Sequence, residues 1–199
     1  YGKVRLRERS QGEELYWKIL CWISEKIDAV GGDIGQMARL EHVLTDYYYA
    51  NFSVFQSLPD LWAIDQIFPV MPIHRLKEKP TRNVVLSDIT CDSDGKINKF
   101  AHGGELHPSL PLHDINPEKG EDYMLGVFLV GAYQETLGDL HNLLGDTNVV
   151  SVSLDASGKL RYRNELEGDT VAEVLSYVEY DPKQLVTQFR NLAESAVAS

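Results

Sequence analysis

Residues 83–97, NVVLSDITCDSDGKI, decide the fold of this chain. The apolar run at residues 83–90 predicts a β-strand that ends in a polar cluster. Asp94-Gly95 supplies the positive φ angles of a tight turn, so residues 96–102 are expected to return as an antiparallel strand. The stretch therefore predicts an antiparallel sheet with a polar turn at the end of an apolar strand.

On both sides of this stretch the sequence contains further short runs that are typical of β-strands. Short apolar or alternating runs separated by turn residues favour an antiparallel arrangement over a parallel βαβ sheet. Residues 123–133, YMLGVFLVGAY, form the most apolar run and are expected to be the central strand. The other predicted strands are residues 47–56, 66–73, a weak strand at 107–113, and a hairpin of 149–154 with 159–163.

Helical periodicity marks both ends of the chain. Residues 10–30 and 33–46 predict a helical hairpin, in which Gly31-Gly32 ends the first helix and Asp33 caps the second. The other predicted helices are residues 134–144, 169–177 with Asp169 or Thr170 as N-cap, and 181–193 with Asp181 as N-cap and Pro182 at the first helical position.

Together these elements predict an α+β, mainly β fold. The expected architecture is an antiparallel Greek-key β-sandwich or barrel with an N-terminal helical hairpin and C-terminal helices. The expected divisions are the helical hairpin at residues 1–46, the β-domain at 47–180 and the start of a C-terminal helical segment at 181–199.

The composition is that of a folded protein, with 43% hydrophobic and 25% charged residues. A net charge of -11 argues against binding to nucleic acid or to anionic membranes, because both require basic surfaces. No apolar run approaches the ~20 residues of a membrane span, and no signal-peptide pattern is present. Two cysteines without such a signal, Cys21 and Cys91, suggest free thiols in a reducing, cytoplasmic compartment.

The segment TCDSDG at residues 90–95 is the densest polar cluster in the sequence. It follows a predicted strand, a position where rigid elements often hold catalytic groups. A calcium-binding loop is rejected, because the loop pattern places Ala101 where a bidentate Glu is required. From spacing alone, a solvated hairpin turn remains the competing interpretation.

No other motif predicts a metal or a phosphate loop. His102, His107 and His113 have spacings that match no compact zinc pattern, so we predict no metal site. Gly103-Gly104 lacks the strand, helix and Lys-Ser/Thr of a phosphate loop, and no G-x-S-x-G nucleophile motif is present.

Gly131-Ala-Tyr133 ends the most apolar run and leads directly into a predicted helix. A tyrosine hydroxyl beside a helix N-terminus can hydrogen-bond a phosphate, but a core tyrosine with a satisfied hydroxyl explains the position equally well. His141 follows on the same predicted helix, where a histidine is more often structural. The residues alone leave two classes open: an interaction or accessory domain, and part of an enzyme whose other groups lie elsewhere.

Several longer stretches occur in one order from about residue 10 to residue 192. They are YANFSVFQSLPDLW (49–62), IDQIFP (64–69), DITCDSDG (88–95), GAYQETLGDLHNLLGD (131–146), GDTVA (168–172), DPK (181–183) and TQFR (187–190). In this order they resemble the biosynthetic, alanine-racemase-like arginine decarboxylases. The pieces FQS, CDSDG and YQE favour arginine over ornithine or diaminopimelate as the substrate.

This resemblance implies a pyridoxal phosphate (PLP) barrel, an inserted helical region, a β-domain and C-terminal helices. The chain matches the insertion, the β-domain and the beginning of the last helices, and it lacks the barrel with its Schiff-base lysine. We therefore expect a fragment, a processing product or one piece of a split protein, inactive alone. The expected partners are a PLP barrel, in the same or a separate chain, and further copies in a homodimer or tetramer.

The resemblance also implies conversion of L-arginine to agmatine and CO2 in polyamine biosynthesis, with PLP as the electron sink. Cys91 is then expected to protonate the substrate carbon and Asp92 to bind the guanidinium, both in the partner subunit's site. Tyr133 would bind the PLP phosphate, His141 would line the pocket wall, and Asp94 would fix either the turn or the guanidinium. The resemblance leaves open whether Mg²⁺ is a second cofactor.

One departure from related enzymes limits this transfer. Ornithine decarboxylases carry an acidic residue where Phe52 and Ser53 stand here, so substrate contacts cannot be copied from that relative. The competing hypotheses are a non-catalytic binding or assembly domain and a decarboxylase of ornithine, lysine or diaminopimelate.

Overall fold

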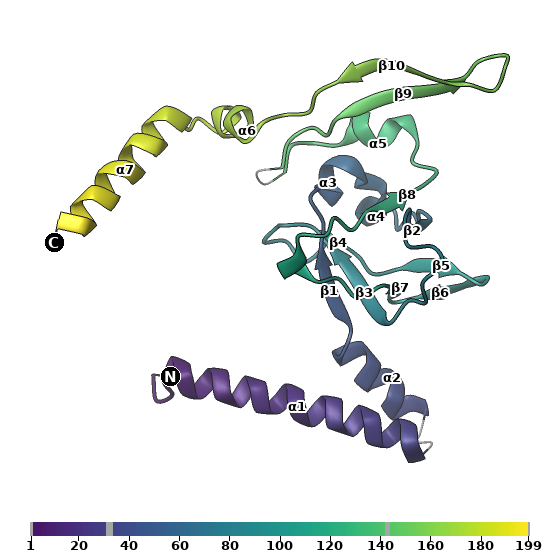
Figure 1. Cartoon of the computed structure of the whole chain (residues 1–199), viewed down its shortest axis with the longest axis vertical. Helices are drawn as coiled ribbons and strands as arrows, with labels where there is room; N and C mark the ends of the chain where they lie inside the picture. The colour runs from purple at the N-terminus through teal and green to yellow at the C-terminus, as the bar shows by residue number, and fades with distance from the viewer. Residues whose placement is uncertain (1, 31–33, 142–143, 199) are drawn as a thin grey trace. The chain divides into compact units, whose positions relative to one another are not determined.

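The computed structural model describes residues 2–30, 34–141 and 144–198 as a mixture of helices and strands (Figure 1). The chain divides into two compact units, each built from several stretches of sequence. Unit 1 comprises Tyr1–Tyr48, Met71–Val85 and Asn98–Gly126; unit 2 comprises Tyr49–Val70, Leu86–Ile97 and Val127–Ser199. The division at residues 46 and 180 that the sequence suggests stays a prediction.

Unit 1 begins with two helices, α1 (Leu6–Val30) and α2 (Ile34–Val43), which contact each other. Arg9 and Glu13, one turn apart on α1, form an exposed ion pair at 2.8 Å, as helical spacing favours. The predicted pair of helices is confirmed. Its predicted stop and cap at residues 31–33 lie outside the described residues.

The sheet of unit 1 grows around β3 (Arg82–Ser87), which begins in this unit. β7 (Leu110–Leu112) pairs with β3 in antiparallel register and places Leu110 opposite Val84. Leu110, Leu112 and Val84 are buried, whereas the residue between the two leucines is exposed, because side chains alternate between the faces of a strand. The other strands that begin in this unit are β1 (Asp46–Tyr49), β5 (Phe100–His102), β6 (Glu105–His107) and β8 (Leu125–Val127).

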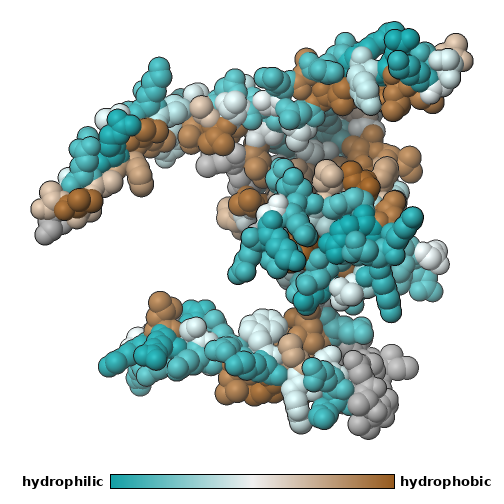
Figure 2. All heavy atoms as spheres, in the orientation of Figure 1, coloured by the Kyte–Doolittle hydropathy of each residue, from teal (hydrophilic) through white to brown (hydrophobic). Residues whose placement is uncertain are grey.

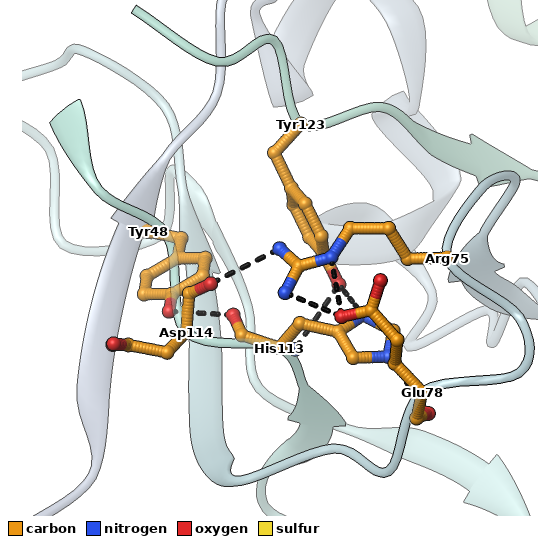
Figure 3. A network of polar contacts seen from close by, with 6 residues as sticks. All are labelled: Tyr48, Arg75, Glu78, His113, Asp114 and Tyr123. Carbon is orange, nitrogen blue, oxygen red and sulfur yellow. Dashed lines mark hydrogen bonds and ion pairs between the residues drawn. The ribbon is translucent and has the colours of Figure 1, made fainter. Parts of the chain in front are cut away.

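A buried histidine, His113, joins three segments of unit 1 (Figure 3). Its Nε2 lies 3.0 Å from the carbonyl oxygen of Glu78, and its Nδ1 lies 2.7 Å from the hydroxyl of Tyr123. The hydroxyl of Tyr48 donates to the carbonyl oxygen of His113 at 3.0 Å. These contacts tie β1 and the segments on either side of β7 to one another.

Arg75 extends this network on its outer side (Figure 3). Its guanidinium pairs with Glu78 at 2.7 Å and donates to the carbonyl oxygen of Asp114 at 3.1 Å. The same group lies 5.9 Å from the centre of the Tyr123 ring, within the range of a cation–π contact. The network therefore has a buried centre at His113 and a charged rim formed by Arg75 and Glu78.

In unit 2, β3 ends and pairs with β4 (Lys96–Ile97). Leu86 of β3 lies opposite Ile97 of β4, and both side chains are buried. The turn that the sequence predicts between these strands is confirmed. It contains residues 88–95, with the cysteine and the three aspartates that the sequence marks out.

Three short helices pack against one another in unit 2: α3 (Val54–Ser57), α4 (Pro59–Ala63) and α5 (Ala132–Leu137). The buried side chain of Gln134 joins α4 to α5, because its Oε1 accepts the backbone N–H of Asp60 at 3.1 Å. Its Nε2 donates to the carboxylate of the same aspartate at 2.5 Å. This reciprocal pair fixes the first turn of α5.

The C-terminal part of unit 2 follows the sequence pattern closely. β9 (Val149–Leu154) and β10 (Leu160–Leu166) form the predicted hairpin. α6 (Val171–Tyr177) begins at Thr170, whose side chain caps the helix, and α7 (Pro182–Ala198) begins after Asp181. The Asp181 carboxylate accepts the backbone N–H of Lys183 at 2.9 Å, as an N-cap does.

The strand predicted at residues 123–133 is wrong in length and in place. The structure has a three-residue strand, β8 (Leu125–Val127), in a two-stranded sheet with β2 (Val70–Pro72). β8 ends at Val127, and two residues later the backbone of Leu129 has a φ of 61°, outside the extended region of a strand. The side chain of Leu129 is 85% exposed. The following helix is α5, which ends at residue 137 and not at residue 144.

The α+β class is confirmed at this level. Among the described residues the strands form one four-stranded sheet and three two-stranded sheets. Helical residues outnumber strand residues, so the fold is mixed and not mainly β. Greek-key closure into a sandwich or barrel stays a prediction.

Unit 2 presents apolar side chains on its last elements (Figure 2). Along α7, Val186, Phe189 and Leu192 are each more than half exposed, and so are Val152 of β9 and Tyr162 of β10. Exposed apolar side chains gathered on one helix or one hairpin usually mark a face that another element covers. None of the helices in the described part is long and apolar enough to cross a membrane.

Candidate functional site

The candidate site is built on the turn of unit 2 at residues 90–95, where side chains fix the backbone. The hydroxyl of Thr90 accepts the backbone N–H of Asp92 at 3.1 Å. The carboxylate Oδ1 of Asp92 accepts the backbone N–H of Asp94 at 2.9 Å, which makes an Asx-turn. The polar residues of the cluster therefore shape the turn as well as furnishing candidate chemical groups.

Cys91 lies at the tip of this turn with its thiol free and exposed. Asp92 beside it is also exposed, and its Oδ1 is the atom engaged in the turn. A free thiol next to a fixed carboxylate can deliver a proton and hold a cation, respectively. Asp94 is exposed too and contributes its backbone to the turn.

The residue that anchors the turn is Asp88, which the sequence reading did not single out. Its carboxylate is 1% exposed, and its Oδ2 accepts the backbone N–H of Val54 at 2.8 Å. Burial raises the pKa of the Asp88 carboxyl, while the Val54 N–H and the nearby His141 act in the opposite direction. The sequence did contain one signal that could have identified Asp88, which is an acidic residue at the end of a short apolar strand.

His141 lies in the same unit and is half-buried. Its ring centroid is 4.2 Å from that of Phe55, at a tilt of 42°. His141 lies near enough to Asp88 for a charge on its ring to lower the pKa of the Asp88 carboxyl. Asp88 stands three residues before Cys91 in the same turn. The sequence-based expectation that His141 lines a pocket wall stays a prediction.

Tyr133 occupies the first turn of α5 and is 74% exposed. The interpretation as a core tyrosine is therefore wrong, and its hydroxyl is accessible to a ligand. α5 itself is short, with six residues. What Tyr133 offers is a hydroxyl donor on a helix whose start is fixed by Gln134.

A pocket of about 370 Å³ lies beside this helix start in unit 2. Its lining includes Gly131, Gln56 and Asp146. The Nε2 of the buried Gln56 donates to the carboxylate of Asp146, an interaction that joins residues far apart in the sequence. The sequence pattern gave no sign of this pair, because it depends on a contact between helix α3 and a loop 90 residues further along the chain.

The three histidines that the sequence marks out, His102, His107 and His113, do not form one cluster. His102 and His107 stack on each other at 3.7 Å on the β5–β6 hairpin, whereas His113 is enclosed by the network of Figure 3. Across residues 2–30, 34–141 and 144–198, no group of three or more His, Cys, Asp or Glu side chains is placed to hold a metal ion.

Comparisons of this chain with known proteins agree on one family. Residues 171–198 match the family described as the arginine decarboxylase C-terminal helical extension. The biosynthetic arginine decarboxylase of Rhodopirellula baltica is 48% identical over 198 residues, covering 100% of this chain and 29% of the relative. That of Phocaeicola vulgatus is 52% identical over 187 residues, covering 94% of this chain and 29% of the relative.

A solved structure agrees with these matches. The crystal structure of the biosynthetic arginine decarboxylase SpeA from Campylobacter jejuni is similar to 96% of this chain, with a TM-score of 0.58 and 33% sequence identity. The similarity covers 33% of the SpeA chain, so this chain spans about a third of the length of the relatives that it matches. The chain therefore belongs to the biosynthetic arginine decarboxylase family, of which it corresponds to a C-terminal portion.

Proposed function

We propose that this chain is the C-terminal part of an enzyme that converts L-arginine to agmatine and CO2, the first step from arginine towards polyamines. The observation that supports the proposal is the turn at residues 90–95, which presents an exposed thiol and an exposed carboxylate from a buried anchor at Asp88. This turn lies in a chain about half identical to biosynthetic arginine decarboxylases.

PLP is the cofactor we propose for this reaction; when bound, it takes up the electron pair that remains when CO2 leaves. The described residues fit the rim of such a site. Tyr133 offers an accessible hydroxyl that can donate to the phosphate, and a pocket of about 370 Å³ lies beside the start of the same helix. The groups that hold the ring would come from the part of the relatives that this chain does not span.

Cys91 is proposed to deliver the proton that replaces the lost carboxylate on the α-carbon. Its thiol is exposed at the tip of a turn that two side chains hold in place, so it can reach into a neighbouring site. A proton donor must lie within hydrogen-bonding reach of the carbon that it protonates. The rigid turn meets this requirement better than a mobile loop would.

Asp92 is proposed to bind the guanidinium at the far end of the substrate. Its Oδ1 already accepts a hydrogen bond from the turn, which fixes the orientation of the carboxylate. A guanidinium can donate to such a carboxylate through charge-assisted hydrogen bonds. This preorganised acid would favour the planar guanidinium of arginine, which can donate two parallel hydrogen bonds to it, over the ammonium group of ornithine or lysine.

Assembly completes the proposal. The apolar side chains of α7, β9 and β10 are exposed in unit 2 and would be covered in an intact enzyme. We propose that a PLP barrel and a second subunit supply this cover, in a homodimer or a tetramer. The two free cysteines fit a reducing compartment, such as the cytoplasm.

The test is release of CO2 from carboxyl-labelled arginine by the intact protein in the presence of PLP. Ornithine and lysine serve as matched substrates, because both have a distal amine in place of the guanidinium. We expect release from arginine and much less from the other two. Release from ornithine or lysine instead would identify a related decarboxylase, and no release from any of them would overturn the proposal in favour of a binding or assembly domain.

A further inference from the structure

Asp88 occupies an unusual position for a carboxylate. It follows β3 directly, stands three residues before Cys91 and is 1% exposed. Its backbone N–H donates to the carbonyl oxygen of Gly95 at 2.9 Å, so it closes the turn from within. Burial of a carboxylate is unfavourable unless its oxygens are hydrogen-bonded, so a buried carboxylate is expected to have a specific structural or functional role.

One oxygen of this carboxylate reaches a second segment of unit 2. Oδ2 accepts the backbone N–H of Val54, a fully buried residue 34 positions earlier in the sequence, at 2.8 Å. The next residue is Phe55, whose ring contacts His141. A single hydrogen bond therefore links the turn that carries Cys91 to the segment that supports His141.

The other oxygen fills the inside of the turn. Among the described residues, Oδ1 of Asp88 is buried and has no hydrogen-bond partner. A Cβ built on Gly95 would overlap this oxygen and the methyl group of Thr90. The carboxylate, the glycine and the threonine are thus in close contact, and the turn cannot shift without disturbing Asp88.

We propose that Asp88 is a positioning residue, whose buried carboxylate holds the turn of Cys91 and Asp92 against the segment of Phe55 and His141. The inference rests on the proposed function of Cys91 and Asp92. Asp88 is enclosed, so it acts on the reaction through the placement of these neighbours. A displacement of about 1 Å in a reacting group can lower a rate by about two orders of magnitude, which is why such an anchor matters.

Substitutions at Asp88 separate the contribution of its charge from that of its hydrogen bond to Val54. Asp88→Asn keeps an acceptor for the Val54 N–H at nearly the same volume, whereas Asp88→Ala leaves that N–H buried without a partner. Asp155→Ala is the matched control. The Asp155 carboxylate accepts the backbone N–H groups of Ser157 and Lys159 at 2.9 and 3.0 Å in the β9–β10 turn, which carries no proposed site residue.

The experiment uses the intact protein with PLP and two readouts. The first is decarboxylation of arginine, measured as kcat and as the amount of agmatine formed for each CO2 released, which reports whether the proton reaches the substrate carbon. The second is the rate at which iodoacetamide alkylates Cys91, measured by peptide mass spectrometry with the exposed Cys21 as an internal reference.

We expect Asp88→Ala to lower kcat by roughly tenfold or more and to reduce the agmatine formed per CO2. We expect its Cys91 alkylation rate to change by about threefold or more, because a thiol's reactivity depends on its surroundings. Asp88→Asn should keep most of both properties. Asp155→Ala should match the parent protein in both.

If Asp88→Ala lowers only the melting temperature and matches the Asp155→Ala control in both readouts, Asp88 is merely structural and the proposal is wrong. Should Asp88→Ala fail to fold, Asp88→Ser, which keeps a polar group in the same space, takes its place under the same criteria. If the parent protein releases no CO2 from arginine, the proposed function fails, while the alkylation rates still decide whether Asp88 positions Cys91.

Discussion

Nδ1 of His113 lies 2.7 Å from the hydroxyl oxygen of Tyr123, and the two side chains satisfy each other's hydrogen bonds. Nε2 of His113 faces the carbonyl oxygen of Glu78, which can only accept, so in the neutral ring Nδ1 is the acceptor and Tyr123 donates. The Tyr123 oxygen accepts the backbone N–H of His113 in return, at 3.1 Å. The centre of unit 1 thus depends on one hydroxyl group.

Removal of that hydroxyl should destabilise the protein. In Tyr123→Phe, Nδ1 and the backbone N–H of His113 lose their partner while buried, which we expect to lower the free energy of unfolding by about 1–3 kcal/mol. Denaturant unfolding of the intact protein measures this change. Tyr162→Phe is the control, because Tyr162 is 60% exposed and its loss should change stability by less than about 0.5 kcal/mol. Equal effects of the two variants would contradict the assignment.

The stability of unit 1 should depend on alkaline pH through Tyr48. Burial, followed by the charges of Asp46 and Asp114, raises the pKa of the Tyr48 hydroxyl above its ordinary value. The folded state then holds this proton more tightly than the unfolded state, so the stabilisation is present below the unfolded pKa and is lost as the pH rises through the folded pKa. Unfolding midpoints between pH ~9 and ~11 should therefore fall less steeply in Tyr48→Phe than in the parent. Parallel slopes would rule this linkage out.

Two glycines should respond oppositely to alanine. A Cβ at Gly138 would overlap the backbone of Gln56, so Gly138→Ala should destabilise the protein by about 1–3 kcal/mol. Gly12 lies inside α1 with no atom within 4 Å of a new Cβ, so Gly12→Ala should stabilise by about 0.5–1 kcal/mol. Thermal and denaturant unfolding of both variants provide the check. A stable Gly138→Ala would mean that the α3–α5 contact is looser than the structure shows.

Asp92 permits a test of charge without loss of the turn. In Asp92→Asn the amide oxygen can still accept the N–H of Asp94, so the turn persists while the charge is removed. We expect KM for arginine to rise by roughly 10- to 100-fold, since a hydrogen bond to a charged group contributes about 1.5–3 kcal/mol. Asp155→Asn makes the same charge change in the β9–β10 turn, which carries no proposed site residue, and serves as the control. If the two variants raise KM equally, general electrostatics and not a specific contact explains the effect.

Local sequence signals predicted the elements that are stabilised locally. The N-caps at Thr170 and Asp181 and the hairpin of β9 with β10 occur where the sequence indicated. Each depends on hydrogen bonds within a few residues, so no distant part of the chain is needed to form it. The turn at residues 90–95 belongs to this group in its own hydrogen bonds, whereas its attachment to the segment of Val54 depends on the distant contact of Asp88.

Where burial decides the structure, the sequence was a weaker guide. The apolar run at residues 123–133 was expected to be a central strand, yet Met124 and Leu129 are exposed. Apolarity indicates that a segment needs cover, and does not say which part of a chain or assembly provides that cover. The relatives are about three times as long as this chain, which is consistent with a covering partner beyond it.

The sequence by itself determined the short-range elements, the polar turn and the resemblance to one decarboxylase family. The tertiary structure alone decided that Asp88 is buried, that its carboxylate accepts the backbone N–H of Val54, and that the ring of His141 contacts that of Phe55. The reason is physical: a turn or a cap is specified by the hydrogen bonds of neighbouring residues. The burial of a carboxylate is specified by everything that packs around it, from segments that the sequence keeps 34 residues apart.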